Sequence, residues 1–189
     1  MALVVCDASD GVTSQDLRVA ELAMQSNCAT ALVLNKWDVA EVVDLDHERA
    51  RAHKKLRLRP RVLTASAKTG RHVERLLVEA AALSDRSSGR IPTSQLNRFL
   101  ADAVAARQPP AKRGNRLKLL YMTQTGERPP RFSIQVNSRD RLSREYAYFL
   151  ENRLRERYRL EGIPVVIDFV ERHERRSGGR TIDAGAAAR

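Results

Sequence analysis

Thr30-Ala31-Leu32-Val33-Leu34-Asn35-Lys36-Trp37-Asp38 is the stretch that decides the fold, because an apolar run stops abruptly in polar residues. An almost wholly apolar run is typical of a strand buried on both faces of a sheet. Ala2–Cys6 and Arg61–Ala65 have the same character, and segments with helical spacing follow the three runs, at residues 14–25, 47–58 and 71–83. Alternation of strand and helix predicts an α/β domain with three parallel strands, and Ser14 is the expected cap of the first helix.

A different order of strands and helices is expected after Asp85-Arg86-Ser87-Ser88-Gly89-Arg90, a polar stretch of mostly small residues where we place a domain boundary. The expected elements beyond it are a helix capped by Thr93 or Ser94, alternating strands at 117–121 and 132–136, a long helix capped by Ser143, and a strand at 165–169. This order, α-β-β-α-β, predicts an α+β domain. We therefore expect a first half (residues 1–88), a second half (residues 89–172) and a disordered tail (residues 173–189).

Charge is concentrated in the second half. The chain has 34 Lys and Arg against 23 Asp and Glu, a net charge of +11. Residues 1–88 carry 13 basic and 12 acidic groups, whereas residues 89–189 carry 21 and 11. A basic block of this kind favours a polyanionic partner such as nucleic acid, although a solvated arginine-rich surface would give the same count. The apolar runs are too short for a membrane helix, and two cysteines make no disulfide framework.

Two polar motifs follow neighbouring apolar runs, and their chemistry suits guanine. In Asn35-Lys36-Trp37-Asp38, the Asp38 carboxylate can accept hydrogen bonds from N1–H and the exocyclic amine, a donor pair that adenine lacks. Asn35 can bond the base and tie the loop to its neighbours, and the Lys36 stem can lie over the ring. Ser66-Ala67-Lys68 begins 31 positions after Asn35, and there the Ala67 N–H would meet guanine O6. Ligands of parallel sheets bind beyond the carboxyl ends of the strands, which is where both motifs lie.

Two phosphate-side motifs do not occur in the 189 residues. There is no GxxxxGK[ST] phosphate loop, and Asp7-Ala8-Ser9-Asp10-Gly11 has one residue too many for the DxxG loop. The β- and γ-phosphates and Mg²⁺ depend on these loops. We therefore expect the chain to contact the guanine moiety of GTP or GDP, to bind GDP weakly, and to supply neither a catalytic residue nor a metal ligand. Mg²⁺ is expected only in a full-length protein.

The chain resembles the tandem-domain bacterial GTPase family Der, also called EngA. The resemblance rests on residues 7–16, on Asn35–Asp38 and on Ser66-Ala67-Lys68-Thr69-Gly70 in the first half. In the second half it rests on Ile91–Arg98, Lys118–Gln124 and Glu161-Gly162-Ile163-Pro164. It implies the rear part of a Ras-like P-loop GTPase domain followed by a KH-like domain, so that Met1 is expected to fall in mid-domain. The guanine contacts it implies are Asn35, Lys36, Asp38, Ser66, Ala67 and Lys68.

The resemblance also implies a role in maturation of the large ribosomal subunit through GTP binding and hydrolysis. The expected partners are the large subunit and ribosomal RNA, with no membrane and no DNA, and the expected location is the cytoplasm. Three functions remain open: part of a ribosome-assembly GTPase that is inactive alone, an RNA- or ribosome-binding KH-like module with an inactive GTPase remnant, or a split enzyme completed by another chain.

Basic residues around a loop of the second half are the candidate RNA contacts. They are Lys112, Arg113, Arg116 and Lys118, and simple solvated charge is an equal alternative. A second candidate cluster, Arg153, Arg155, Arg157 and Arg159, does not form one stripe, because alternate positions spread around a helix, and solvated charge is an equal alternative there too. The aromatic residues Tyr121, Phe132, Tyr146 and Phe149 fit core positions better than a base-stacking platform.

Overall fold

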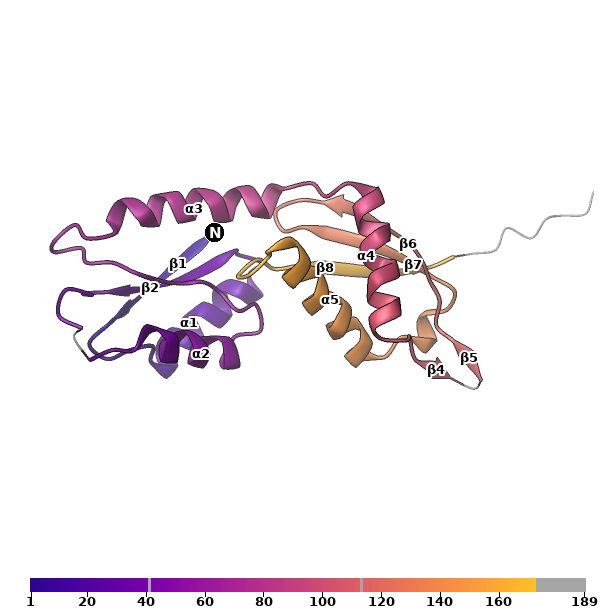
Figure 1. Cartoon of the computed structure of the whole chain (residues 1–189), viewed down its shortest axis with the longest axis horizontal. Coiled ribbons are helices and arrows are strands. Elements are labelled where there is room, and N and C mark those ends of the chain that lie inside the picture. The colour runs from indigo at the N-terminus through magenta and orange to yellow at the C-terminus, as the bar shows by residue number, and fades with distance from the viewer. Residues whose placement is uncertain (41, 113, 173–189) are drawn as a thin grey trace, which may run out of the picture.

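The computed structural model describes residues 1–40, 42–112 and 114–172 and contains one three-stranded sheet in each half (Figure 1). The elements of the first half are β1 (Ala2–Asp7), α1 (Ser14–Gln25), β2 (Thr30–Asn35), α2 (Leu45–Lys55), β3 (Val62–Thr64) and α3 (Val73–Ser88). The strands lie in the order β1-β2-β3 and both pairings are parallel. The predicted three-stranded parallel sheet is therefore confirmed.

Helices cover both faces of this sheet, with α1 and α2 on one side and α3 on the other (Figure 1). Alternation along the strands explains the arrangement, since Leu32 and Leu34 pack with α1 and α2 while Ala31 packs with Leu83 of α3. The expected burial of β1 on both faces is wrong at one position. Val5 is 61% exposed, because β1 is an edge strand of the described sheet.

The helix ends differ from the expected ones for local reasons. α1 is capped by Thr13, not Ser14, because Thr13 and Asp16 form a reciprocal capping box. α2 begins earlier than predicted, at Leu45, because the Asp44 side chain accepts from the N–H groups of Asp46 and His47. α3 continues to Ser88, so the first four residues of the polar stretch 85–90 are helical and not a linker.

The second half contains α4 (Thr93–Ala106), a short hairpin of β4 (Ala111–Lys112) and β5 (Asn115–Arg116), β6 (Leu119–Gly126), β7 (Arg131–Val136), a 3₁₀ turn (Arg139–Arg141), α5 (Arg144–Tyr158) and β8 (Val166–Glu171). β6 and β7 are antiparallel, and β7 and β8 are parallel. The predicted α+β order is confirmed, and the hairpin is an addition to it. Ser143 caps α5 as expected, whereas Pro92 occupies the cap position of α4.

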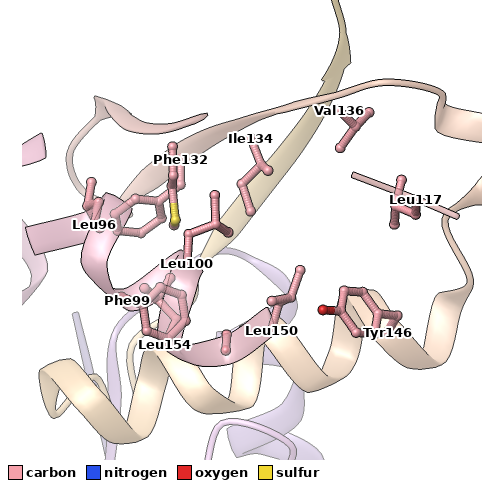
Figure 2. Packing of buried hydrophobic residues seen from close by; sticks show 12 residues of the cluster. Leu96, Phe99, Leu100, Leu117, Phe132, Ile134, Val136, Tyr146, Leu150 and Leu154 are labelled. Atoms are coloured by element: carbon pink, nitrogen blue, oxygen red, sulfur yellow. The ribbon is translucent and has the colours of Figure 1, made fainter. Parts of the chain in front are cut away.

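One apolar core holds the second half together. Alternate residues of β7, Phe132, Ile134 and Val136, are fully buried beneath α4 and α5, which contribute Leu100 and Leu150 among others (Figure 2). Tyr146 and Phe132 belong to this core and Phe149 packs against it, as predicted. Tyr121 does not, because its side chain points to the open face of the sheet and is 42% exposed.

The two halves meet at the loop between α5 and β8. The Thr30 N–H donates to the Gly162 carbonyl at 2.8 Å, and the Gly162 N–H donates to the Leu58 carbonyl at 2.7 Å. Leu160 and Ile163 complete the cluster that α3 forms on the first sheet. The start of β2 is thereby fixed by the second half, while its other end carries the polar motif.

Candidate guanine-nucleotide site

Two loops meet beyond the carboxyl ends of β2 and β3. The Ala67 N–H donates to Asn35 Oδ1 at 3.0 Å, and the Trp37 N–H donates to the Ala65 carbonyl at 3.1 Å. Parallel pairing of β2 with β3 brings the two loops to the same sheet edge, although Asn35 and Ala67 are 32 positions apart. The N–H that sequence reasoning assigned to guanine O6 thus donates to Asn35 in this structure.

Asp38 carries the hydrogen-bond acceptor of the site. The side chain is half-buried, and its Oδ1 is covered and has no hydrogen-bond partner within the described ranges. The Ser66 hydroxyl is the main cause that lowers the pKa of the Asp38 carboxyl, and Lys68 contributes, so Asp38 is ionised at neutral pH. A covered carboxylate oxygen without a partner fits the N1–H and amine donors of guanine.

Lys36 is held over the end of β1. Its backbone is left-handed, with φ of 61°, and its ammonium pairs with Asp7 Oδ2 at 2.5 Å. The pair lowers the pKa of Asp7 and raises that of Lys36. Asp7 was missed as a site residue, although its place at a strand's carboxyl end was a usable signal. The backbone sets where the Lys36 stem begins, and the ion pair holds its ammonium end at the end of β1.

Ser66 closes the second loop. It is fully buried, its N–H donates to the Arg71 carbonyl at 2.9 Å, and its hydroxyl accepts from the Thr69 N–H at 3.1 Å. Lys68 is exposed at the rim. Trp37 packs partly buried against the apolar cluster of α1, α2 and the sheet, which places most of its contacts beneath the loop.

Glu48 of α2 was not foreseen from the sequence. It is only 7% exposed and accepts from the Val12 N–H at 2.8 Å, which fixes the loop that follows β1. Gly11 leaves room for this carboxylate, since a Cβ there would lie 3.2 Å from it. Val12 and Glu48 are 36 positions apart, so no local sequence pattern predicts the hydrogen bond between them.

Comparison with known proteins agrees with this geometry. The elongation factor Tu GTP-binding domain family matches residues 1–103, and the C-terminal KH-domain-like family of EngA bacterial GTPase enzymes matches residues 90–169. GTPase Der of Ruminiclostridium cellulolyticum is 40% identical over 169 residues, which are 87% of this chain and 38% of that protein. GTPase Der of Syntrophotalea carbinolica is 39% identical over 183 residues, 93% of this chain and 41% of that protein.

The chain belongs to the Der (EngA) family of GTPases. It spans about two fifths of the length of the curated relatives it matches, and it corresponds to their C-terminal part. The two candidate guanine loops of this Der chain, at residues 35–38 and 66–70, lie in the segment matched by the GTP-binding domain family.

The basic residues of the Der chain's second half are less free than their sequence suggests. Lys112 Nζ donates to the Asp140 carbonyl at 3.3 Å, and Arg116 donates to Gln108 at 3.1 Å. Lys118 is exposed, and Arg113 lies outside the described residues. Arg155 is wrong as a surface candidate, because it is 3% exposed and pairs with Glu151 at 2.7 Å.

Neither a metal centre nor a membrane-spanning helix is present in the described ranges of this Der chain. No three His, Cys, Asp or Glu side chains gather there in a group that could hold a metal ion. No helix in those ranges has the length and apolar character needed to cross a membrane.

Proposed function

We propose that this chain supplies guanine recognition and ribosome contact for a GTP-driven step in maturation of the large ribosomal subunit. Asp38 sets the base preference, and Asn35 links the two loops through the Ala67 N–H. Ser66 holds the second loop beside Asp38, and Lys36 and Lys68 are exposed around the site. GTP binding and hydrolysis belong to the whole protein of this family, because the 189 residues contain no GxxxxGK[ST] phosphate loop.

The contact between Asn35 Oδ1 and the Ala67 N–H is the observation that carries the proposal. This hydrogen bond, at 3.0 Å, joins the two motifs whose chemistry suits guanine. Asp38, in the first of these motifs, has a covered Oδ1 without a hydrogen-bond partner among the described residues. A pair of strand-end turns that served only structure would have no reason to leave a covered carboxylate oxygen without a donor.

Replacement of Asp38 by Asn tests base recognition. The carboxylate accepts two donors from guanine, whereas an amide can accept N1–H and donate to the C2 carbonyl of xanthine. We expect Asp38→Asn to lose more than about tenfold in affinity for GMP, since hydrogen bonds to charged groups contribute about 1.5–3 kcal/mol, and to gain affinity for XMP.

Amide chemical shifts of the 189-residue chain, titrated with GMP, AMP and XMP at millimolar concentration, measure this preference even when binding is weak. Asp10→Asn is the matched control, because Asp10 is exposed and its side chain makes no hydrogen bond among the described residues. Equal shifts with GMP and AMP in the unchanged chain would contradict the assignment.

A second candidate, an RNA- or ribosome-binding module with an inactive GTPase remnant, is favoured by the charge. Residues 89–189 hold nearly all of the positive excess, and Lys118 is exposed in the segment that follows the hairpin of β4 and β5. The two candidates differ in whether guanine nucleotide changes binding to the ribosome.

Cosedimentation with purified large and small ribosomal subunits separates them. The first candidate predicts preference for the large subunit and a dependence on GTP in the full-length protein, and the second predicts binding without nucleotide. We expect Lys112→Glu with Lys118→Glu to weaken binding, whereas Lys54→Glu with Lys55→Glu, the same charge change at exposed positions of α2, should not.

A further inference from the structure

An arginine-lined groove runs along the outer edge of β3, apart from the guanine loops. It encloses about 510 Å³. Six arginines and one glutamate line it, together with His53 and several apolar side chains. The arginines come from α2, from the segment before β3, from α3 and from the residue that follows α5: Arg49, Arg59, Arg61, Arg75, Arg86 and Arg159. Convergence of one charge from four parts of the chain is costly unless an anion compensates it.

Half of these arginines are already paired. Arg49 pairs with Asp46 at 2.5 Å, Arg59 with Glu156 at 3.8 Å, and Arg61 with Glu79. These pairs anchor the walls of the groove and reduce its charge. The remaining arginines are therefore the candidates to meet a ligand.

Arg75, Arg86 and Arg159 have no ion pair or hydrogen bond to a described residue through their side chains. The Nε and Nη2 atoms of Arg86 are covered from solvent and have no hydrogen-bond partner in the described part of the chain. Covered guanidinium donors without acceptors are rare, because desolvation of a charged group is expensive. Arg86 therefore points to an anion with several acceptor oxygens, which a phosphate group provides.

The spacing along α3 indicates an extended ligand. Arg75 and Arg86 are 11 positions apart on one helix, which is about 16 Å at 1.5 Å per residue. One phosphate cannot reach both positions, whereas successive phosphates of a polynucleotide can. An acidic peptide paired to the edge of β3 fits less well, because β3 has only three residues and offers few backbone bonds.

We propose that this arginine groove binds the phosphate backbone of a nucleic acid strand. The lining of the groove extends from Thr64 of β3 to Arg159 and Glu161 of the second half and includes no residue of the two loops at 35–38 and 66–70. This inference does not rest on the proposed guanine or ribosome functions, since it uses none of Asp38, Lys112 and Lys118.

Fluorescence anisotropy of a labelled 12-nucleotide uridine RNA with the intact chain tests the proposal. The variant Arg75→Ala with Arg159→Asn removes two unpaired arginines, and Asn tolerates the left-handed backbone at position 159, where φ is 53°. We expect a loss of at least about tenfold in affinity, and a salt dependence of log Kd lower by about 1.4, since each single-strand phosphate contact contributes about 0.7.

The matched control is Arg18→Ala with Arg98→Ala, which removes the same charge from exposed positions outside the groove. Equal losses of RNA affinity in the two double variants would overturn the proposal, because they would show that affinity depends only on the net charge of the chain. Loss of RNA binding only in the Lys112 and Lys118 variant would also overturn it and would leave the ribosome proposal intact.

Arg86→Met separates ligand binding from a structural role. Met fills a similar space without donors, so the melting temperature without RNA should be unchanged or higher, while RNA affinity falls. A lower melting temperature with unchanged affinity would contradict the role given to Arg86. Competition experiments test the choice of ligand. If a 12-residue polyglutamate or pyrophosphate, at equal anionic charge, displaces the labelled RNA as well as unlabelled RNA does, the assignment to a polynucleotide is overturned.

Discussion

At the scale of single residues, burial decides the chemistry of Cys6. The thiol is 2% exposed, and burial, with Asp16 and Glu48 nearby, raises its pKa from 9.0 to about 12. The folded chain therefore keeps the thiol proton at a pH where the unfolded chain has lost it. The contribution of this protonated thiol to the free energy of unfolding is fully present below about pH 9 and is lost as the pH rises from 9 towards 12.

Replacement of Cys6 by Ala should reduce the loss of stability at alkaline pH. We expect the melting temperature of the unchanged chain to fall between pH 8.5 and 10.5 by more than that of Cys6→Ala, because the variant has no buried thiol to ionise. Cys28→Ala, at a half-buried position, is the control and should follow the unchanged chain. Parallel curves for all three proteins would contradict the argument.

The candidate guanine residues show what a single sequence can predict at this scale. The strand-end positions of Asn35, Asp38 and Ser66 were predictable, because apolar runs that stop in polar residues are a local property of the sequence. Glu48 and the pairing of Lys36 with Asp7 were not predicted, because each depends on contacts between residues 36 or 29 positions apart. The direction of the Ala67 N–H also depends on how the two loops meet, which no local pattern gives.

At the scale of elements, β1 is an open edge of the described sheet. The N–H groups of Ala2 and Ala8 donate to the Ala29 and Asn35 carbonyls of the β2 side. Because alternate amides of a strand point the same way, the N–H groups of Leu3 and Val5 point away from β2. Val5 is exposed and the strand carries no Lys or Pro, so the edge is suited to pair with another strand.

Hydrogen exchange should resolve this alternation. In a dilute monomer of the chain we expect fast exchange at Leu3 and Val5 and slower exchange at Val4 and Cys6. Protection of Leu3 and Val5 should appear only with concentration-dependent association, and Val5→Lys should suppress both. Strong protection of Leu3 and Val5 in a demonstrated monomer would contradict an open edge.

The loop between α5 and β8 makes backbone contacts that hold the two halves together. Gly162 has φ of 74°, and a Cβ there would lie 2.2 Å from the Thr30 carbonyl oxygen. Gly70 has nearly the same backbone, φ of 77°, but a Cβ at that position would meet nothing within 4 Å. Substitution by Ala at these two positions therefore distinguishes the free-energy cost of a left-handed backbone from the cost of a steric clash with β2.

We expect Gly70→Ala to cost about 1–2 kcal/mol of unfolding free energy, from the backbone alone. Gly162→Ala should cost about 1–3 kcal/mol more, because the clash must also be relieved. Urea unfolding of both variants measures the difference. Equal costs would show that Gly162 does not approach β2 closely enough for a methyl group to clash.

Element types followed from the sequence more reliably than element ends. Apolar runs and Ser143 gave the strands and the start of α5, because burial and capping are local. Residues 85–88 are helical although they are polar and small, since α3 extends along the junction and Arg128 of the second half donates to the Ser87 carbonyl. The hairpin of β4 and β5 was missed because two-residue strands have no readable period.

At the scale of the whole molecule, the two halves share a core but differ in independence. The second half has its own closed cluster of buried residues from α4, α5 and the sheet (Figure 2). The cluster on the α3 side of the first sheet, in contrast, is completed by Leu160 and Ile163 of the second half. The side chain of Glu151 also crosses the junction to pair with Arg57. The first half therefore depends on the second more than the second depends on the first.

Residues 89–172 expressed alone should therefore fold, with a cooperative thermal transition, because their main core includes no residue of the first half. Their melting temperature should be lower than in the intact chain, since Leu160 and Ile163 become exposed when the first half is absent. Circular dichroism follows the transition, and hydrogen exchange should show lost protection at residues 160–163 and retained protection in α4 and β7.

Residues 1–88 alone should show no comparable cooperative transition. A second half that unfolds without cooperativity, or a first half of equal stability, would contradict this asymmetry.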